Sequence, residues 1–186
     1  LKKGMKYMLR TKDILDEKDP RVRAKNTDVD FPLNDEYKDI IPEMLKHLRY
    51  SQIEKLSKKY DLRPGMGLAA PQLGINKNFF VVCYEVKDGV FDDYILINPK
   101  VISYSEEMIY AGEGEGCLSV NREVEGIVPR HARITVEAYD LDGNKRKYRV
   151  REDLAIAFQH ELDHLNGILF VDYIDPKDPY KNAELY

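Results

Sequence analysis

The stretch that decides the fold lies near the C-terminal end of the chain and reads DLAIAFQHELDHL, residues 153–165. It contains no glycine or proline, and Asn166-Gly167 follows it, so the pattern predicts a helix with a C-terminal cap. One side of this helix is apolar, with Leu154, Phe158, Leu162 and Leu165. Ile156 and Ala157 add apolar surface on the side that carries the histidines. Apolar residues on both sides predict a buried central helix.

The polar side of this helix carries an H-E-x-x-H motif made by His160, Glu161 and His164. At about 100° per residue, the two histidines lie about 40° apart on the helix surface, and Glu161 lies about 100° from His160. Two imidazoles can therefore hold one divalent ion while the carboxylate reaches a water beside it. The structural alternative is a hydrogen-bonded pair of core histidines, and the burial and spacing favour the metal site.

A catalytic metal site needs a third protein ligand and one open position. One class of proteases places a third histidine where this chain has Phe170, which cannot bind a metal. Another class takes a glutamate from a later helix, but Glu184 follows two prolines and stands close to the chain end. The better candidate is Cys117 in the glycine-rich stretch GEGEGCLSV (112–120), because thiolate and imidazole together suit a divalent metal. The alternative for Cys117 is a small buried residue, the role that we expect for Cys83.

The segments before the helix predict strands. Two apolar runs, 79–84 and 94–97, are rich in β-forming residues, and Asn98-Pro99 closes the second. Residues 133–139 alternate between apolar and polar, and a short turn leads into 145–150, which predicts a hairpin. Strands followed by one terminal helix predict an α+β fold, with small antiparallel sheets around that helix.

The N-terminal part of the chain has a different pattern. Residues 36–60 repeat apolar side chains at helical spacing and predict one or two amphipathic helices. His47 lies among lysines, and we expect it at the surface. The length predicts one domain, 1–186. Within it, residues 1–60 form an irregular arm and the helical stretch, 61–175 form the catalytic core, and 176–186 form a loosely attached tail.

Composition excludes several classes of protein. Hydrophobic residues make up 43% and charged residues 33%, so a core can form inside a well-solvated surface. With 29 basic and 33 acidic residues the net charge is −4, which argues against holding nucleic acid by phosphate neutralisation. No apolar run is long enough for a membrane helix, and no apolar stretch follows the charges of residues 1–10. Two cysteines cannot form a disulfide framework, so we expect a soluble cytoplasmic protein.

A second glycine-rich stretch reads GMGLAAPQ, residues 65–72. It is not a phosphate-binding loop, because it lacks the terminal Gly-Lys-Ser/Thr. Its small residues would let an extended peptide pair with the backbone, and Gln72 offers a neutral amide donor that can stabilise an oxyanion. Tight packing is the structural alternative.

Together three segments resemble the peptide deformylases in their order and spacing: GMGLAAPQ (65–72), EGCLS (115–119) and QHELDH (159–164). The resemblance covers residues 60–175 closely, and the longer helical stretch is similar to the type 2 enzymes of Gram-positive-like bacteria. Met66 stands where that group usually has a smaller branched residue. The resemblance implies small antiparallel sheets around the motif helix. It also implies removal of the N-formyl group from the initiator methionine of new polypeptides.

Carried over by position, the resemblance implies a role for each motif residue. The implied metal ligands are Cys117, His160 and His164, and the implied general acid/base is Glu161. The implied oxyanion hole consists of the Gln72 side-chain amide and the Leu118 backbone N–H. The implied peptide track consists of Met66, Gly67 and Gly116, with Ile156 and Ala157 facing the methionine side chain.

The resemblance also carries expectations about the metal and the partners. Ligand softness suits zinc, whereas the resemblance implies Fe²⁺ in the cell, with Zn²⁺, Ni²⁺ or Co²⁺ able to occupy the site in purified protein. The expected substrates are formyl-methionyl peptides at the ends of nascent chains, with at most a transient contact with the ribosome. We expect a monomer with no membrane contact and no direct nucleic-acid recognition.

Two other functions fit parts of the pattern. A zinc endopeptidase of the H-E-x-x-H type is the first alternative, and Phe170 and Cys117 argue against it. A non-enzymatic metal-binding module is the second alternative. It would need a fourth strong ligand, which the sequence does not show near the motif.

Overall fold

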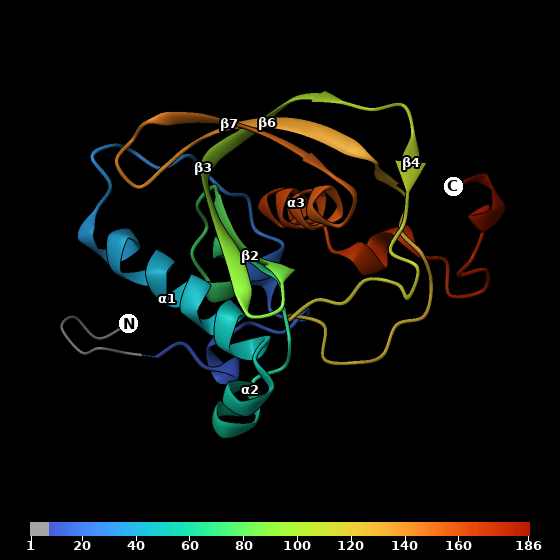
Figure 1. The fold of residues 1–186 in the computed structure, drawn as a ribbon, viewed down its shortest axis with the longest axis horizontal. Coiled ribbons are helices and arrows are strands. Elements are labelled where there is room, and N and C mark those ends of the chain that lie inside the picture. Colours follow the sequence, from blue (N-terminus) through green and yellow to red (C-terminus); the bar gives the residue numbers. More distant parts are fainter. Residues whose placement is uncertain (1–7) are drawn as a thin grey trace.

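The computed structural model describes residues 8–186 (Figure 1). Residues 1–7 of the expected N-terminal arm lie outside the described part of the chain. A five-stranded antiparallel sheet has the order β1-β2-β3-β6-β7. Its strands are β1 (Gly67–Ala69), β2 (Phe79–Lys87), β3 (Val90–Tyr104), β6 (Arg133–Tyr139) and β7 (Lys145–Arg151). A small second sheet pairs β4 (Met108–Ile109) with β5 (Arg130–His131). The α-helices are α1 (Asp35–Ser51), α2 (Glu54–Tyr60) and α3 (Glu152–Leu165). The α+β fold, the amphipathic helices and the β6–β7 hairpin are confirmed.

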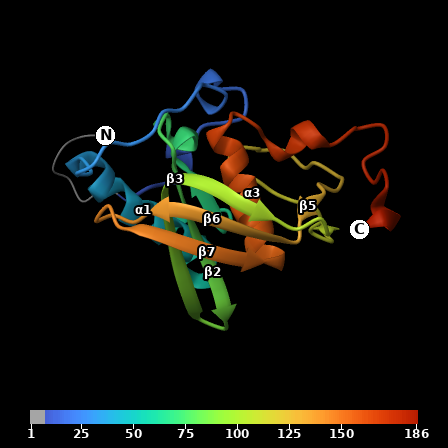
Figure 2. The same ribbon diagram turned by 90° about the horizontal axis from the view of Figure 1, so that it is seen from above.

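Strand β2 lies between two hydrophobic cores, with α1 on one face and α3 on the other (Figure 1). Successive side chains of a strand point to opposite faces. Phe79, Val81 and Cys83 accordingly pack with α1, whereas Phe80 and Val82 pack with α3. Seen from above, β3, β6 and β7 lie side by side over α3 (Figure 2). The sheet thus covers the motif helix on one side, which confirms the prediction that this helix is central and buried.

The end of α3 is set by Gly167, whose φ of 71° is a left-handed conformation that suits glycine. The Gly167 N–H donates to the His164 carbonyl at 3.1 Å, and the Ile168 N–H donates to the Asp163 carbonyl at 2.9 Å. This pair of bonds is the Schellman motif, which satisfies carbonyls that a helix end leaves free. The predicted cap is confirmed, and it fixes the turn of helix that carries His164.

One strand differs from the prediction at Asn98-Pro99, which bends β3 and does not end it. The pairing of β3 with β6 shifts register between Ile97 and Lys100. Asn98 adopts a positive φ of 51°, and its side chain accepts from the Val29 N–H and donates to the Val29 carbonyl. Because the ladder is irregular at this point, the missing N–H of proline costs no sheet hydrogen bond.

His47 is buried, and the expectation of a surface position is wrong. Its side chain is 1% exposed on α1, and its Nδ1 lies 2.8 Å from the Leu9 carbonyl oxygen. His47 follows Met44 by three residues, so it lies on the apolar face of the helix although its neighbours in the sequence include lysine. The hydrogen bond ties the N-terminal arm to this helix.

This burial predicts a loss of stability in mild acid. Burial lowers the pKa of His47 below its usual 6.5, so the unfolded chain binds a proton more readily than the folded protein. The stability that the neutral histidine contributes is therefore present above pH 6.5 and is lost as the pH falls through the folded pKa. Urea unfolding between about pH 7.5 and pH 5.5 should show a smaller decline for His47→Asn than for the wild type. Equal declines in the two proteins would contradict the assignment.

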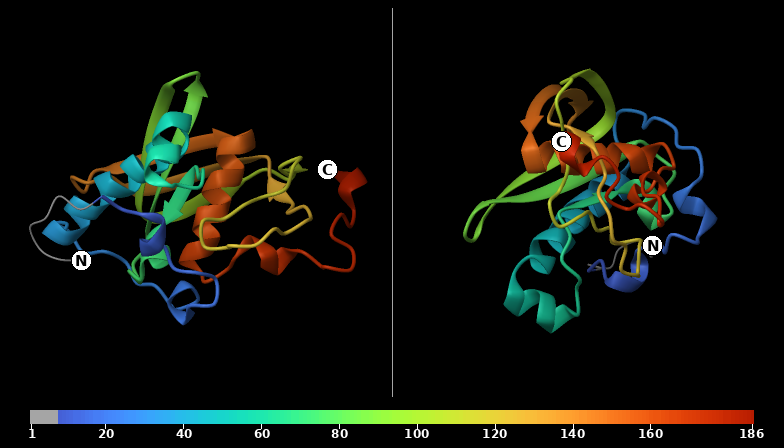
Figure 3. Two further views of the ribbon diagram at one scale, coloured as in Figure 1. Left: turned by 90° about the horizontal axis from the view of Figure 1, so that it is seen from below. Right: turned by 90° about the vertical axis from the view of Figure 1, so that its right-hand side faces the viewer.

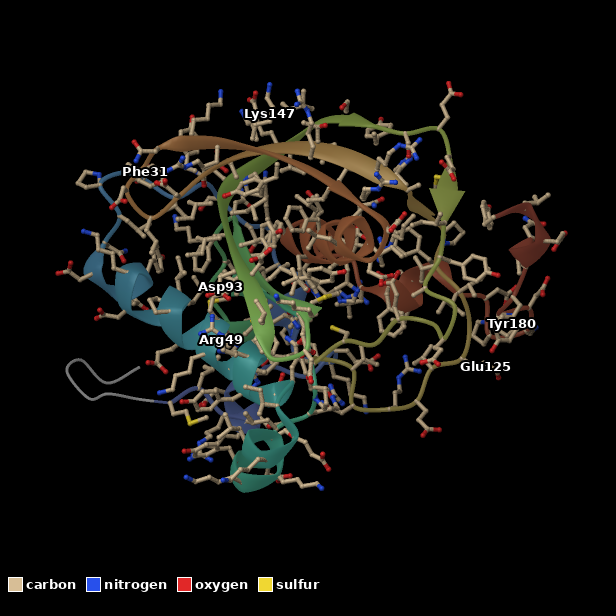
Figure 4. All side chains as sticks on the ribbon, viewed as in Figure 1. Phe31, Arg49, Asp93, Glu125, Lys147 and Tyr180 are labelled. Atoms are coloured by element: carbon tan, nitrogen blue, oxygen red, sulfur yellow. The ribbon has the colours of Figure 1, made fainter. Side chains whose placement is uncertain are left out.

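The C-terminal segment runs beside the loop that leads from β4 to β5 (Figure 3). The Ile127 N–H donates to the Pro179 carbonyl at 3.0 Å, and the Tyr180 hydroxyl donates to Glu125 at 2.8 Å. Glu125 and Tyr180 face each other at this contact (Figure 4). Within residues 8–186, none of the helices has both the length and the apolar character that crossing a membrane requires.

Candidate active site and metal centre

Three metal-ligating side chains meet on the inner side of α3. Atoms of Cys117, His160 and His164 that can bind a metal all lie within 4.8 Å of one another. The Cys117 Sγ lies 3.3 Å from the His164 Nε2, and the two imidazole rings have centroids 5.0 Å apart. One thiolate and two imidazoles form a donor set suited to a divalent metal, with one position left for water or substrate. The residues present therefore fit the metal that the motif predicts.

The loop that carries Cys117 is held from outside by Arg63. Its guanidinium donates to the carbonyl of Cys117 at 2.7 Å and to the carbonyl of Val120 at 3.2 Å. Both acceptors are backbone atoms, so one planar fork fixes the path of the loop on either side of Leu118. Arg63 thereby positions the cysteine without touching its sulfur.

Gln72 lies directly behind the thiol. Its Nε2 is 3.6 Å from the Cys117 Sγ and donates to the Ser119 hydroxyl at 3.0 Å, while its Oε1 accepts from the Ala69 N–H at 2.9 Å. Gln72 is 1% exposed, so these bonds fix which end of the amide points at the site. The amide donor that the sequence singled out therefore lies against the Cys117 thiol, one of the three side chains that could hold a metal.

A buried charge network orients the other side of the centre. The His160 Nδ1 lies 2.8 Å from Glu115, which leaves the Nε2 free to bind a metal. Arg130 holds Glu115 with two bonds of 2.9 and 3.0 Å and also reaches Asp163 at 2.5 Å. Burial favours the neutral acid, but the hydrogen bonds from His160 and Arg130 hold the pKa of Glu115 below its usual value. The Tyr173 hydroxyl closes the network by donating to Asp163 at 2.9 Å.

Glu161 stands beside the three ligands with free hydrogen-bonding capacity. It is 3% exposed, its Oε1 lies 4.0 Å from the His160 Nε2, and its Oε2 has no partner among residues 8–186. Burial raises the pKa of Glu161 to about 7. A carboxylate of this kind can take up and release a proton near neutral pH, as a general acid/base must.

A cavity of about 940 Å³ opens onto this centre. It is lined by most of the residues predicted for the site: Met66, Gly67, Gly116, Cys117, Leu118, Ile156, Ala157, His160 and Glu161. Gln72 and His164 lie in the wall behind it, both 1% exposed. Glu125, which Tyr180 of the C-terminal segment contacts, also lines this cavity. The structure therefore brings every predicted site residue to one place.

Gly67 has a steric role beside Glu161. A Cβ at position 67 would lie 2.6 Å from the Glu161 Oε1, so any side chain would displace the carboxylate. Gly67→Ala is expected to lower kcat by about ten- to a hundredfold, because small misplacements of catalytic groups are costly. Gly112→Ala is the matched control, since a Cβ there would meet nothing within 4 Å. Steady-state kinetics would contradict this role if both variants kept wild-type kcat.

A buried helix with two histidines and a glutamate, a cysteine facing them and an open cavity together define a metal-dependent hydrolase. The polypeptide deformylase family model matches residues 11–180. The peptide deformylase of Macrococcus caseolyticus is 50% identical over 175 residues, which cover 94% of this chain and 95% of that protein. The enzyme of Oceanobacillus iheyensis is 46% identical over 177 residues, covering 95% of this chain and 97% of that protein.

Solved structures agree. A probable peptide deformylase from Synechococcus phage S-SSM7 has a TM-score of 0.72 and 35% identity, and the match covers 87% of this chain and 98% of that one. The Thermotoga maritima peptide deformylase has a TM-score of 0.69 and 33% identity, with coverage of 91% and 99%. The chain belongs to the polypeptide deformylase family. It is a metal-dependent hydrolase that removes the formyl group from nascent peptides, which confirms the expected function, and the endopeptidase alternative is not favoured.

Two residues of the site were missed from the sequence. Arg130 and Arg63 lie outside the three motifs and act through Glu115 and through the carbonyl of Cys117. The sequence does carry a signal for Glu115, which stands two residues before Cys117 in the glycine-rich motif. No comparable signal marks the arginines, because their partners are distant in the chain.

Proposed function

We propose that Cys117, His160 and His164 bind one divalent metal and that Glu161 is the general acid/base of deformylation. The observation that carries the proposal is the convergence of the three donor side chains within 4.8 Å, beside a buried glutamate and at the wall of an open cavity. Substrate-binding roles follow for Met66, Gly67, Gly116, Ile156 and Ala157, which line that cavity.

A divalent ion bound there supplies Lewis acidity, which lowers the pKa of a water and polarises the formyl carbonyl. Glu161 accepts a proton from the attacking water and delivers it to the leaving amine. The Gln72 amide and the Leu118 N–H donate to the oxygen on which negative charge develops, and one such donor is worth about 3 kcal/mol of barrier. The apolar side chains of Ile156 and Ala157 receive the methionine side chain.

The finer expectations complete the proposal. The metal in the cell is Fe²⁺, and Zn²⁺, Ni²⁺ or Co²⁺ can replace it in purified protein. Residues 61–175 form the catalytic core, residues 1–60 support it, and residues 176–186 form a tail. The protein works in the cytoplasm as a monomer on formyl-methionyl nascent chains, with at most transient ribosome contact.

Formate release from formyl-Met-Ala-Ser tests the function directly. Protein purified without oxygen and loaded with Fe²⁺ or Ni²⁺ is expected to release formate, and removal of the metal with a chelator should abolish release. Casein is the comparison substrate for an endopeptidase. A folded protein with one bound metal that releases no formate, or that cleaves casein, would overturn the proposal.

A further inference from the structure

Strand β7 carries a row of cations on the outer face of the sheet, although the whole chain has a net charge of −4. Strand β7 reads KRKYRVR and lies at the edge of the sheet. In the β6–β7 pair, Ile134 and Val150 face each other and are buried over α3. Side chains at alternating positions therefore point away from the core. Lys147 projects from this outer face (Figure 4).

Three arginines and three hydroxyls line one groove on this face. The groove has a volume of about 390 Å³, and its polar lining includes Arg133, Arg149, Arg151, Ser103, Ser105 and Thr135. The strand register explains the grouping, since Thr135 lies between Ser103 on β3 and Arg149 on β7. The Ser105 hydroxyl donates to the Glu107 carbonyl at 2.9 Å, so the donors that the groove offers are the hydroxyls of Ser103 and Thr135 and the three guanidinium groups.

The positive charge of the groove is poorly neutralised by the protein. Arg149 is exposed and has no ion pair within residues 8–186. Arg151 approaches Glu152 only at 3.7 Å, with both side chains 74% exposed, while Arg133 contacts Glu107 at 2.7 Å. Exposed pairs of this kind contribute little. An external anion would therefore meet the unpaired guanidinium of Arg149 and two guanidinium groups whose exposed ion pairs compete with it only weakly.

Arg133 and Arg151 lie directly opposite each other in the β6–β7 ladder. Like charges at facing positions destabilise a sheet, so the pair is unfavourable for folding alone. Charged residues on an edge strand also prevent edge-to-edge association, and β7 has that benefit. Protection of the edge would explain charged residues on β7. It does not explain why two arginines face each other, or why hydroxyls of β3 and β6 lie beside them. A bound anion accounts for both.

Against the expectation drawn from the net charge of the whole chain, we propose that this groove binds the phosphate backbone of structured RNA. Arginine forks and hydroxyls are the donors that phosphate oxygens take in protein–nucleic acid contacts. The cations at positions 145, 147, 149 and 151 repeat every second residue, which is about 7 Å along a strand. Glu137 of β6 is the shared partner of Lys145 and Lys147, at 3.2 and 3.7 Å, so one carboxylate faces two cations and the row keeps a positive charge. Such a row suits a linear polyanion more than a single small anion. Tyr104 at the groove already stacks on His131, with ring centroids 4.4 Å apart, and its 64% exposure leaves surface that a base can contact.

The occupant also fits the activity, because a deformylase that meets nascent chains works beside ribosomal RNA. The groove lies on β3, β6 and β7, and none of its residues lines the cavity at the metal centre. Binding there would hold the enzyme near its substrate while leaving the active site open. The proposal goes beyond the hydrolase activity and can fail independently of it.

Fluorescence anisotropy with a labelled RNA duplex of about 20 base pairs tests the proposal on the metal-loaded enzyme. The variant is Arg149→Gln/Arg151→Gln, and the matched control is Lys55→Gln/Lys58→Gln on α2, which removes the same charge from exposed positions. We expect the β7 variant to bind about tenfold more weakly and to lower the slope of log affinity against log salt by about two. The control should match the wild type.

Three results would overturn the proposal: equal RNA affinity in the wild type and the β7 variant, an equal loss in the control, or binding to phosphatidylglycerol vesicles or inorganic phosphate but not to RNA. The wild type, the β7 variant and the control should release formate from formyl-Met-Ala-Ser at the same rate. Equal formate release would show that a loss of RNA binding is not caused by a loss of the hydrolase activity. If the double variant folds poorly, Arg149→Gln alone should still lower the salt slope by about one.

Discussion

Glu161→Gln is expected to lower kcat for formate release by about a hundred- to ten-thousandfold while one metal remains bound. The three proposed metal ligands are other side chains, so the substitution removes the proposed proton acceptor and leaves the donor set intact. Glutamine has nearly the same shape and cannot accept the proton from water. The loss should therefore appear in kcat, with a small change in KM.

Folding is not expected to suffer in this variant. Glu161 is 3% exposed with an unpartnered oxygen, and removing a buried carboxylate removes a desolvation cost. Metal content, urea unfolding and formate kinetics should be measured on the same preparation. Glu123→Gln is the matched control, because this exposed carboxylate lines the same cavity. Full activity of Glu161→Gln, or an equal loss in the control, would contradict the role of Glu161.

Much of the site could be predicted because its residues are close in sequence or carry a rigid pattern. The helical period places His160 and His164 on one face, and Gly167 marks the end of their helix. The thiol ligand needed a further argument, since Cys117 reaches α3 from a loop 47 positions away. That argument was chemical: a thiolate and two imidazoles suit a divalent metal, whereas sequence spacing does not connect Cys117 to the helix.

What escaped prediction depends on contacts between distant segments. His47 has a charged sequence context, yet its place in the helical period buries it against the N-terminal arm. Asn98-Pro99 reads as a strand end, and only the register shift with β6 lets β3 continue through it. The net charge of −4 gives no sign of the basic face of β7, because it sums over the whole chain. The groove can be recognised only from the register that places residues of β3, β6 and β7 side by side.

Arg130→Met is expected to lower the free energy of unfolding by about 3–5 kcal/mol. The arginine side chain is 4% exposed, and it satisfies Glu115, which is 5% exposed, and Asp163. Methionine fills similar volume but removes the cation that the Glu115 and Asp163 carboxylates share. Since Glu115 orients His160, metal affinity should also fall by about ten- to a hundredfold. Urea unfolding and metal competition with a chelator measure the two effects.

The same substitution at Arg133 is the control, because Arg133 and its partner Glu107 have side chains 54% and 60% exposed. An exposed pair contributes at most about 1 kcal/mol, so Arg133→Met should unfold almost like the wild type. Adding Glu115→Gln to Arg130→Met should restore part of the stability, since the unpaired charge is then removed. It should not restore metal affinity, because the carboxylate that orients His160 is also lost. A parallel recovery of both properties would show that Arg130 acts on folding alone.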